Sequence, residues 1–146
     1  MQLKLNRHSF GQSAYHLVWR PKYNMKVFRH SDPRIVCEQA ILSIAKRHSI
    51  EVYEIKVMED HIHIFVEIPP TLSVSKVFQI LKGGSSRIFF MACNKWKEVY
   101  CRGNKEPHLW SSAKFYRSVG NVTAEVIQDY IAHSNKCNFN LSTNVA

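Results

Sequence analysis

Residues 61–68 alternate between two kinds of side chain, and no other segment constrains the fold as strongly. Every even position carries isoleucine or valine. The odd positions carry the other side chains, which are His61, His63, Phe65 and Glu67. Because successive side chains of a strand point to opposite faces, the pattern predicts a strand with one wholly apolar face. We expect helices to cover that face and both imidazoles to lie side by side on the other.

A second strand is expected over residues 50–58, and only Glu59-Asp60 separates it from the first. So short a connection joins antiparallel neighbours, because parallel strands need a long crossover. Two further strands are expected over 13–20 and 113–119. We therefore predict a single α+β domain over residues 1–146, a sandwich with a largely antiparallel central sheet and helices packed on it.

Apolar periodicity and capping residues predict the helices between these strands. The first opens at Asp32-Pro33, with the aspartate as N-cap and the proline at the first helical position, and it ends near His48. The next runs over 74–81, is interrupted by Gly83-Gly84 and resumes as a separate helix over 86–98. With a last helix after the final strand, the predicted order is β-α-β-β-α-α-β-α.

Lysine and arginine outnumber aspartate and glutamate by 20 to 11, which gives a formal net charge of +9. Such an excess favours a polyanionic partner, although a solvated basic surface has the same composition. Cations and aromatic rings interleave in residues 19–23 and 114–117, as they do in surfaces that stack unpaired bases. The candidate nucleic-acid contacts in these segments are Arg20, Lys22, Tyr23, Lys114 and Arg117.

No stretch of the chain approaches the roughly 18 consecutive apolar residues of a membrane span, so no membrane partner is expected. The N-terminus lacks the apolar segment of a secretory signal, and the four cysteines form no CxxC pair. These observations favour a reducing, cytoplasmic location.

The spacing of His61 and His63 allows both imidazoles to ligate one metal ion. The alternative is a pair of histidines that are exposed or hydrogen-bonded to each other. The metal interpretation gains from its context, a strand with a dedicated apolar back face in a chain that favours anions.

The segment Lys82-Gly83-Gly84-Ser85-Ser86-Arg87 is a candidate phosphate site. Glycines ahead of a helix leave free backbone N–H groups, and two cations flank them here. The alternative is a plain helix break with a serine cap. Because the segment lacks the Lys-Ser/Thr ending of a Walker A loop, no nucleotide cofactor is expected.

Tyr130 lies on the apolar stripe of the last predicted helix, which Thr123 caps. A packed core tyrosine is the ordinary interpretation of that position. The same stripe faces the sheet, which alternatively brings the phenol near a metal held by the histidines. Only about one phenol in a thousand is ionised at neutral pH, so nucleophilic use needs a divalent cation on the phosphate.

In their joint order these motifs resemble the HUH single-tyrosine transposases, the IS200-like enzymes of insertion sequences that move as single-stranded DNA. The resemblance runs from about Tyr15 to about His133. The segments that carry it are Tyr15-His16-Leu17-Val18-Trp19-Arg20-Pro21-Lys22-Tyr23, Lys26-Val27-Phe28, Asp60-His61-Ile62-His63, Lys82-Gly83-Gly84-Ser85-Ser86-Arg87, Leu109-Trp110-Ser111, Ser118-Val119-Gly120 and Val126-Ile127-Gln128-Asp129-Tyr130-Ile131.

The resemblance implies a chemistry for three of these residues. His61 and His63 would hold Mg²⁺ or Mn²⁺ on a scissile phosphate while Tyr130 attacks it, which forms a 5′-phosphotyrosine and releases a 3′-hydroxyl. It further implies the ferredoxin-like HUH fold, a homodimer, single-stranded DNA with hairpins at the element ends as partner, and a prokaryotic host.

One position departs from that family's pattern. A glutamine usually stands four residues after the tyrosine and completes the metal site, whereas this chain has Ser134. The candidate substitutes are Ser134 itself, acting through water, and His133. The departure motivates a second hypothesis, a catalytically impaired or domesticated relative that binds hairpin DNA or RNA. A third, a plasmid-transfer or replication nickase of the wider HUH group, fits less well because such relaxases usually carry additional domains.

Overall fold

A four-stranded sheet with strand order β4-β5-β3-β6 forms the centre of the computed structural model, which describes residues 4–5, 10–11, 13–101 and 106–119. Every neighbouring pair of strands is antiparallel. The strands are β3 (Ala14–Pro21), β4 (Glu51–Val57), β5 (Ile62–Glu67) and β6 (Trp110–Val119). The predicted antiparallel sheet is confirmed, although its last strand begins at Trp110 rather than at residue 113.

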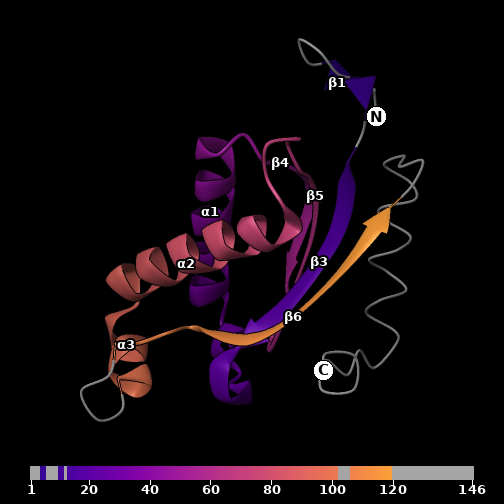
Figure 1. Ribbon diagram of the computed structural model, residues 1–146. Coiled ribbons are helices and arrows are strands. Elements are labelled where there is room, and N and C mark those ends of the chain that lie inside the picture. The colour runs from indigo at the N-terminus through magenta and orange to yellow at the C-terminus, as the bar shows by residue number, and fades with distance from the viewer. Residues whose placement is uncertain (1–3, 6–9, 12, 102–105, 120–146) are drawn as a thin grey trace.

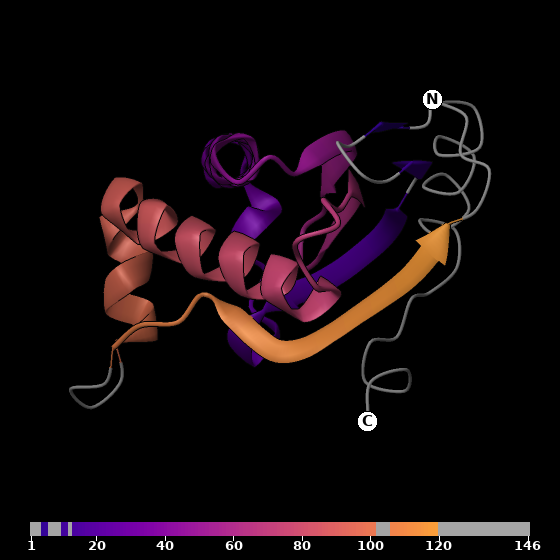
Figure 2. The same ribbon diagram turned by 45° about the horizontal axis from the view of Figure 1, so that its top comes forward.

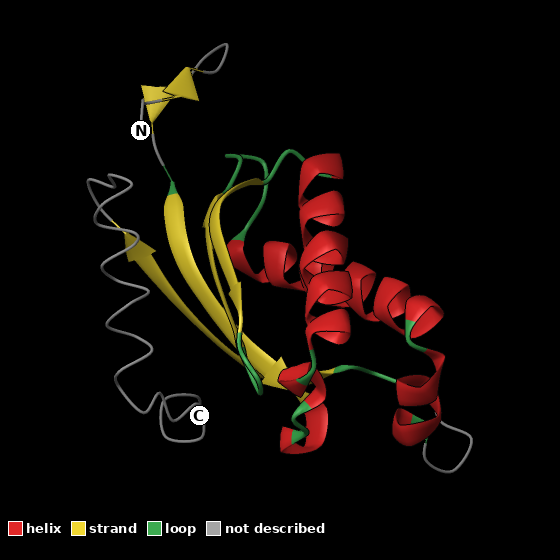
Figure 3. Ribbon diagram, turned by 180° about the vertical axis from the view of Figure 1, so that it is seen from behind, coloured by secondary structure: helices red, strands yellow, loops and turns green. Residues whose placement is uncertain are grey.

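Two long helices cover one face of this sheet, as Figures 1 and 3 show from opposite sides. In Figure 2 the view runs along α1 while α2 passes it lengthwise, so the two helices cross. The helices are α1 (Ser31–Arg47), α2 (Val74–Ala92), the short α3 (Asn94–Tyr100), and the single 3₁₀ turns η1 (Lys22–Asn24) and η2 (Val27–Arg29). A separate two-stranded sheet pairs β1 (Lys4–Leu5) with β2 (Phe10–Gly11).

The start of α1 differs from the prediction. The N-cap is His30, and its side chain makes no capping hydrogen bond. Asp32 and Pro33 therefore lie inside the first turn, where the carboxylate still interacts favourably with the positive end of the helix dipole. Arg34 fixes this start instead, because its Nε donates to the carbonyl oxygen of Phe28 at 2.9 Å. The predicted end near His48 is confirmed.

The predicted break at Gly83-Gly84 is wrong, because α2 runs through both glycines and ends only at Ala92. The two positions differ in their surroundings. A Cβ added to Gly84 would lie 2.7 Å from Cδ1 and 2.9 Å from Cγ1 of Ile44 on α1, whereas one added to Gly83 would meet no atom within 4 Å. Gly84 is thus required by the crossing of α1 and α2, not by a turn.

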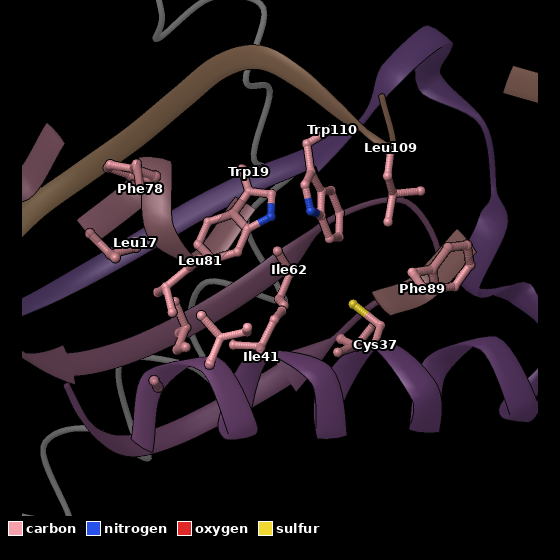
Figure 4. Packing of buried hydrophobic residues seen from close by; sticks show 14 of the residues in the cluster. Leu17, Trp19, Cys37, Ile41, Ile62, Phe78, Leu81, Phe89, Leu109 and Trp110 are labelled. Atoms are coloured by element: carbon pink, nitrogen blue, oxygen red, sulfur yellow. The ribbon is translucent and has the colours of Figure 1, made fainter. Parts of the chain in front are cut away.

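The main core lies between the sheet and these helices (Figure 4). Trp19 is fully buried, and the rings of Phe78 and Trp110 meet it edge-on with centroids 5.8 Å away. Ile62 and Ile64 are also fully buried there. The predicted apolar face of residues 61–68 is therefore confirmed, and helices cover it as expected.

The fold is α+β, as predicted. The predicted order is confirmed from β3 through β6, whereas the last predicted helix lies outside the described residues. No helix among the described residues is both long and apolar enough to cross a membrane.

Candidate active site

The two histidines of the alternating strand lie against each other on the face that α1 and α2 leave uncovered. Their Nε2 atoms are 3.0 Å apart, and the rings meet edge to face. His63 lies in β5 and is fully buried. His61 directly precedes the first residue of that strand and is half-buried. The prediction that both imidazoles lie side by side is confirmed, and both Nε2 atoms point toward one place.

A third histidine, which the sequence interpretation did not single out, extends this pair. Nε2 of His16 lies 3.0 Å from Nδ1 of His63, and the two rings are nearly parallel. His16 stands opposite Phe65 in the β3–β5 register, so it is the diagonal neighbour of His63 on the same face. The clue in the sequence was its place in the β3 alternation, but only the strand register makes it a neighbour of His63.

A carboxylate closes the other end of the row. Nδ1 of His61 lies 2.8 Å from Oδ1 of Asp60, which is exposed. A carboxylate accepts, so this contact places a proton on Nδ1 of His61. Nδ1 of each ring, which faces away from the two neighbouring Nε2 atoms, therefore has a hydrogen-bond partner. The partner is a carboxylate for His61 and an imidazole for His63.

Burial keeps the inner two imidazoles uncharged. Loss of hydration lowers the pKa of His63 to about 3, with smaller contributions from His61, His16 and Lys56. The same cause, together with the nearby Arg117, lowers the pKa of His16 to about 4. At neutral pH both rings thus carry one proton and retain one lone pair for a hydrogen bond or a metal.

Cations from the outer strands border the histidines. Lys56 of β4 stands opposite His63, and Arg117 of β6 stands opposite His16. Both side chains are exposed. The two cations favour an anion beside the imidazoles, while Glu54 of β4 and the buried Glu67 of β5 place carboxylates on the same face. Arg117 was a predicted nucleic-acid contact, and its place is consistent with that prediction.

The row fits a divalent cation by its donor chemistry. Two imidazole nitrogens converge, and each ring has a partner that orients it, as in metal sites of proteins. Within the described ranges no group of three or more His, Cys, Asp or Glu gathers around a point. Mg²⁺ and Mn²⁺ both favour oxygen ligands alongside any imidazole nitrogens. Oxygen ligands from a phosphate or water would complete the coordination.

The segment of residues 82–87 has a different role from the predicted one. Its backbone N–H groups belong to the continuous helix α2, so the predicted phosphate cradle of free N–H groups is absent there. Ser85 is fully buried, and its Oγ accepts a hydrogen bond from Trp110 Nε1 at 2.9 Å. Ser86 Oγ accepts from the backbone N–H of Leu109 at 3.1 Å. Both hydroxyls are hydrogen-bonded to the start of β6, and their predicted contacts with DNA stay predictions.

Lys82 of the same segment also forms a hydrogen bond to β6. Its Nζ donates to the carbonyl oxygen of Ser111 at 2.7 Å. Burial, with a smaller contribution from Lys114, lowers the pKa of Lys82 to about 8. Lys114 itself lies over the ring of Phe78, with Nζ 5.3 Å from the centroid, on the helix-covered side. Of the cations in the 82–87 segment, only Arg87 is exposed.

A groove of about 970 Å³ opens beside this segment, between α2, α3 and the residues before β6. We call it the α2–α3 groove. Its charged lining is basic apart from Glu106, and its apolar lining includes Phe90, Met91 and Trp110. The basic side chains that line it are Lys82, Arg87, Lys97 and His108. This surface favours a polyanion whose bases can contact apolar side chains.

A second aromatic surface follows the end of β3. Tyr23 is half exposed and has a positive φ of 66°, and its ring stacks on Tyr100. Nζ of Lys22 lies 5.3 Å from the centroid of the Tyr23 ring. Arg20 donates to Oδ1 of Asn24 at 2.8 Å and so supports the same turn. We call this surface the Tyr23 ledge. It combines a half-exposed aromatic ring with a cation, as the sequence predicted.

The remaining predicted site residues are Tyr130, His133 and Ser134, and all three lie outside the described residues. Their roles therefore stay predictions.

Comparison with known proteins decides the family. A family model described as "Transposase IS200 like" matches residues 9–134. The chain belongs to the IS200-like transposase family. The resemblance found from the motifs is thereby confirmed. The IS200 transposase of Salmonella typhimurium is 32% identical over 126 residues, which cover 86% of this chain and 79% of that protein. The ISDra2 transposase TnpA of Deinococcus radiodurans is 30% identical over 131 residues, which cover 90% of each chain.

Solved structures of transposases share the fold of this IS200-like chain. A crystal structure of a protein assigned as a transposase from Deinococcus radiodurans superposes with a TM-score of 0.70 at 26% identity. The match covers 89% of this chain and 96% of the other. A REP-associated tyrosine transposase bound to a REP hairpin superposes with a TM-score of 0.53 at 14% identity, covering 89% and 67%. The second likeness bears on the fold alone.

Proposed function

We propose that this IS200-like transposase cuts and rejoins single-stranded DNA at the ends of an insertion sequence, with Tyr130 as nucleophile and His61 and His63 as metal ligands. The observation that carries the proposal is the convergence of the two Nε2 atoms, 3.0 Å apart, beside Lys56 and Arg117 in a chain from this family. The Asp60 and His16 contacts to the outer nitrogens support it.

In this proposal the chain's own residues prepare a phosphate for attack. Mg²⁺ or Mn²⁺, when bound, would neutralise charge on the scissile phosphate. His61 and His63 would hold it through Nε2, since Nδ1 of each ring is already engaged. Lys56 and Arg117 would attract the DNA backbone to the same face.

The proposed chemical step exchanges one phosphodiester for another. The phenolic oxygen of Tyr130 forms a bond to phosphorus, and the bond from phosphorus to the 3′ oxygen breaks. The phenol loses its proton and the leaving 3′ oxygen gains one. Because the 5′-phosphotyrosine preserves the bond energy, a 3′-hydroxyl can reverse the step with no nucleotide cofactor.

The hairpins at the element ends are the proposed ligands of the basic surfaces. The α2–α3 groove and the Tyr23 ledge both combine cations with apolar or aromatic side chains, which supports contacts to phosphates and unpaired bases. The relative bound to a REP hairpin makes a hairpin a reasonable probe. We further propose that the enzyme acts as a homodimer in the cytoplasm of a prokaryote, in line with the bacterial origin of its relatives.

A covalent-adduct assay tests the proposal. Incubation with hairpin-bearing single-stranded DNA and Mn²⁺ should give an adduct that survives denaturing electrophoresis. Tyr130→Phe and His61→Ala should each abolish it. The matched controls are Tyr116→Phe and His30→Ala, which change an exposed tyrosine and an exposed histidine elsewhere and should leave the adduct. Adduct formation by Tyr130→Phe would refute the assignment of the nucleophile.

A second candidate is a relative that binds hairpins without cutting them, and Ser134 at the usual glutamine position favours it. The same assay separates the two. Tight hairpin binding with no adduct in the wild type, together with an adduct in Ser134→Gln, would identify an impaired enzyme whose metal site lacks a ligand.

A further inference from the structure

We propose that His16 is a positioning residue for the metal site, which holds His63 in the tautomer that exposes a lone pair at Nε2. The inference rests on the proposed function, because it assigns a role toward the metal that His61 and His63 would hold. It concerns a residue that makes no proposed contact with metal or DNA and acts only through His63.

The argument starts from proton counting on the imidazole rings. A neutral imidazole has one N–H and one lone pair, so the partner of one nitrogen decides what the other can do. Metal ligation through Nε2 of His63 requires the proton to be on Nδ1. Nδ1 of His63 lies 3.0 Å from Nε2 of His16, which must then accept and carry its own proton on Nδ1. His16 can do so while neutral, as its burial favours.

The packing of His16 holds this acceptor in place. Its ring is fully buried and lies between two others on the same face, stacked on His63 at a centroid distance of 5.2 Å and on Phe65 at 4.8 Å. Phe115 of β6 meets it edge-on. With its ring fixed from two strands, Nε2 of His16 has little freedom to leave Nδ1 of His63.

The two ligands are therefore oriented by different chemistry. The exposed Asp60 orients His61, whereas a neutral, buried imidazole orients His63. A carboxylate at position 16 would bring a negative charge into a buried site, which is costly without a paired cation. A buried neutral acceptor achieves the same orientation without that cost, and this explains why a polar residue occupies a core position of β3.

Without the acceptor, His63 would lose its preference for the ligating tautomer. Loss of an outer partner of a metal-bound histidine typically weakens metal affinity about 10–100-fold. His16→Phe removes the acceptor but keeps a flat ring that can stack on Phe65. His16→Gln keeps an amide oxygen at a reach similar to that of Nε2. The pair thus separates the hydrogen bond from the packing.

The test measures Mn²⁺ affinity by electron paramagnetic resonance, with no DNA present. We expect His16→Phe to raise the dissociation constant about 10–100-fold and His16→Gln to restore it to within about threefold of wild type. The control His30→Phe, at an exposed position, should match wild type. If His16→Phe does not fold, His16→Asn replaces it, because its shorter amide does not reach Nδ1 of His63.

A spectroscopic readout reports the tautomer directly. In ¹⁵N-labelled protein kept free of metal, long-range imidazole correlations should show a proton on Nδ1 of His63 in the wild type and in His16→Gln. The same signature should be lost in His16→Phe. Wild-type Mn²⁺ affinity in His16→Phe, or an unchanged His63 tautomer, overturns the role of His16. Equal Mn²⁺ binding by wild type and His61→Ala instead overturns the proposed metal site itself, so the two failures are distinguishable.

Discussion

Both faces of the central sheet contain fully buried residues, but these are apolar on one face and include two histidines on the other. On the face covered by α1 and α2, residues such as Trp19 and Ile64 pack against other apolar side chains. On the opposite face, His16 and His63 are as fully buried but bond to each other. Adjacent residues of β5 thus belong to a stabilising core and to the candidate site, and a register slip by one residue would exchange them.

The comparison shows that burial alone does not reveal the purpose of a surface. On the helix-covered face, the apolar area removed from water supplies the stability. On the histidine face, each buried polar group needs a partner, and the same burial lowers the pKa values of His63 and His16. The first face should therefore respond to changes in volume and the second to changes in pH.

Among the substitutions, the largest effect on stability is expected from a cavity on the helix-covered face. Trp19→Ala should lower the free energy of unfolding by about 3–5 kcal/mol, because it empties a fully buried site beside Phe78 and Trp110. Urea denaturation followed by far-ultraviolet circular dichroism measures it. The control Met91→Ala, at a position 75% exposed, should change stability by less than about 0.5 kcal/mol. Equal effects of the two variants would contradict the placement of the core.

A smaller effect is expected where the helices over that face cross. Gly84→Ala should destabilise by about 1–3 kcal/mol, because the new methyl group would overlap Ile44. Gly83→Ala meets no neighbour and should stabilise by about 0.5–1 kcal/mol, since alanine favours a helix interior. Opposite signs for adjacent glycines, read from urea midpoints, are the expected result. Stabilisation by both would show that α1 and α2 do not approach closely at Gly84.

The prediction for the other face changes the pH instead of a side chain. The folded-state pKa values of His63 and His16 lie below the usual 6.5. Below pH 6.5 the two histidines therefore bind protons in the unfolded chain but not yet in the folded chain. Stability should fall as the pH drops from about 6.5 toward about 4, by about 1.4 kcal/mol per pH unit for each histidine. Urea titrations with EDTA at several pH values measure this slope.

A variant on each face tests the source of that slope. His16→Phe should remove one histidine's share, whereas Ile64→Val, on the apolar face, should keep the wild-type slope at lower stability. Carboxylates that titrate in the same range contribute equally to all three proteins and cancel in the difference. An unchanged slope in His16→Phe would contradict the low pKa of His16.

The elements that were predicted correctly are those whose pattern is local. The alternation in residues 61–68 fixes a strand and both of its faces, and a short connection fixes the antiparallel pairing with residues 50–58. The joint order of the short motifs carried the family resemblance, which the comparisons confirm. For these features the neighbours along the chain contain the physical cause.

The errors arose where the cause lies in a distant segment. Gly83-Gly84 resembles a helix break, but Gly84 lies inside a helix at a position where Ile44 of another helix leaves no space for a Cβ. Ser85 resembles a phosphate ligand, but its hydroxyl accepts from Trp110, which lies far along the chain. The alternation of β3 placed His16 on the polar face, but only the β3–β5 register brings it to His63.

The residue before β6 links the two surfaces that are candidates for holding DNA. The backbone N–H of Lys22, beside the Tyr23 ledge, donates to the carbonyl oxygen of Leu109 at 2.7 Å. The N–H of Leu109 in turn donates to Ser86 at the α2–α3 groove. Ledge and groove are therefore fastened to one buried residue and keep a fixed separation. A nucleic acid that contacts both surfaces must therefore present its two contacted segments at that fixed separation.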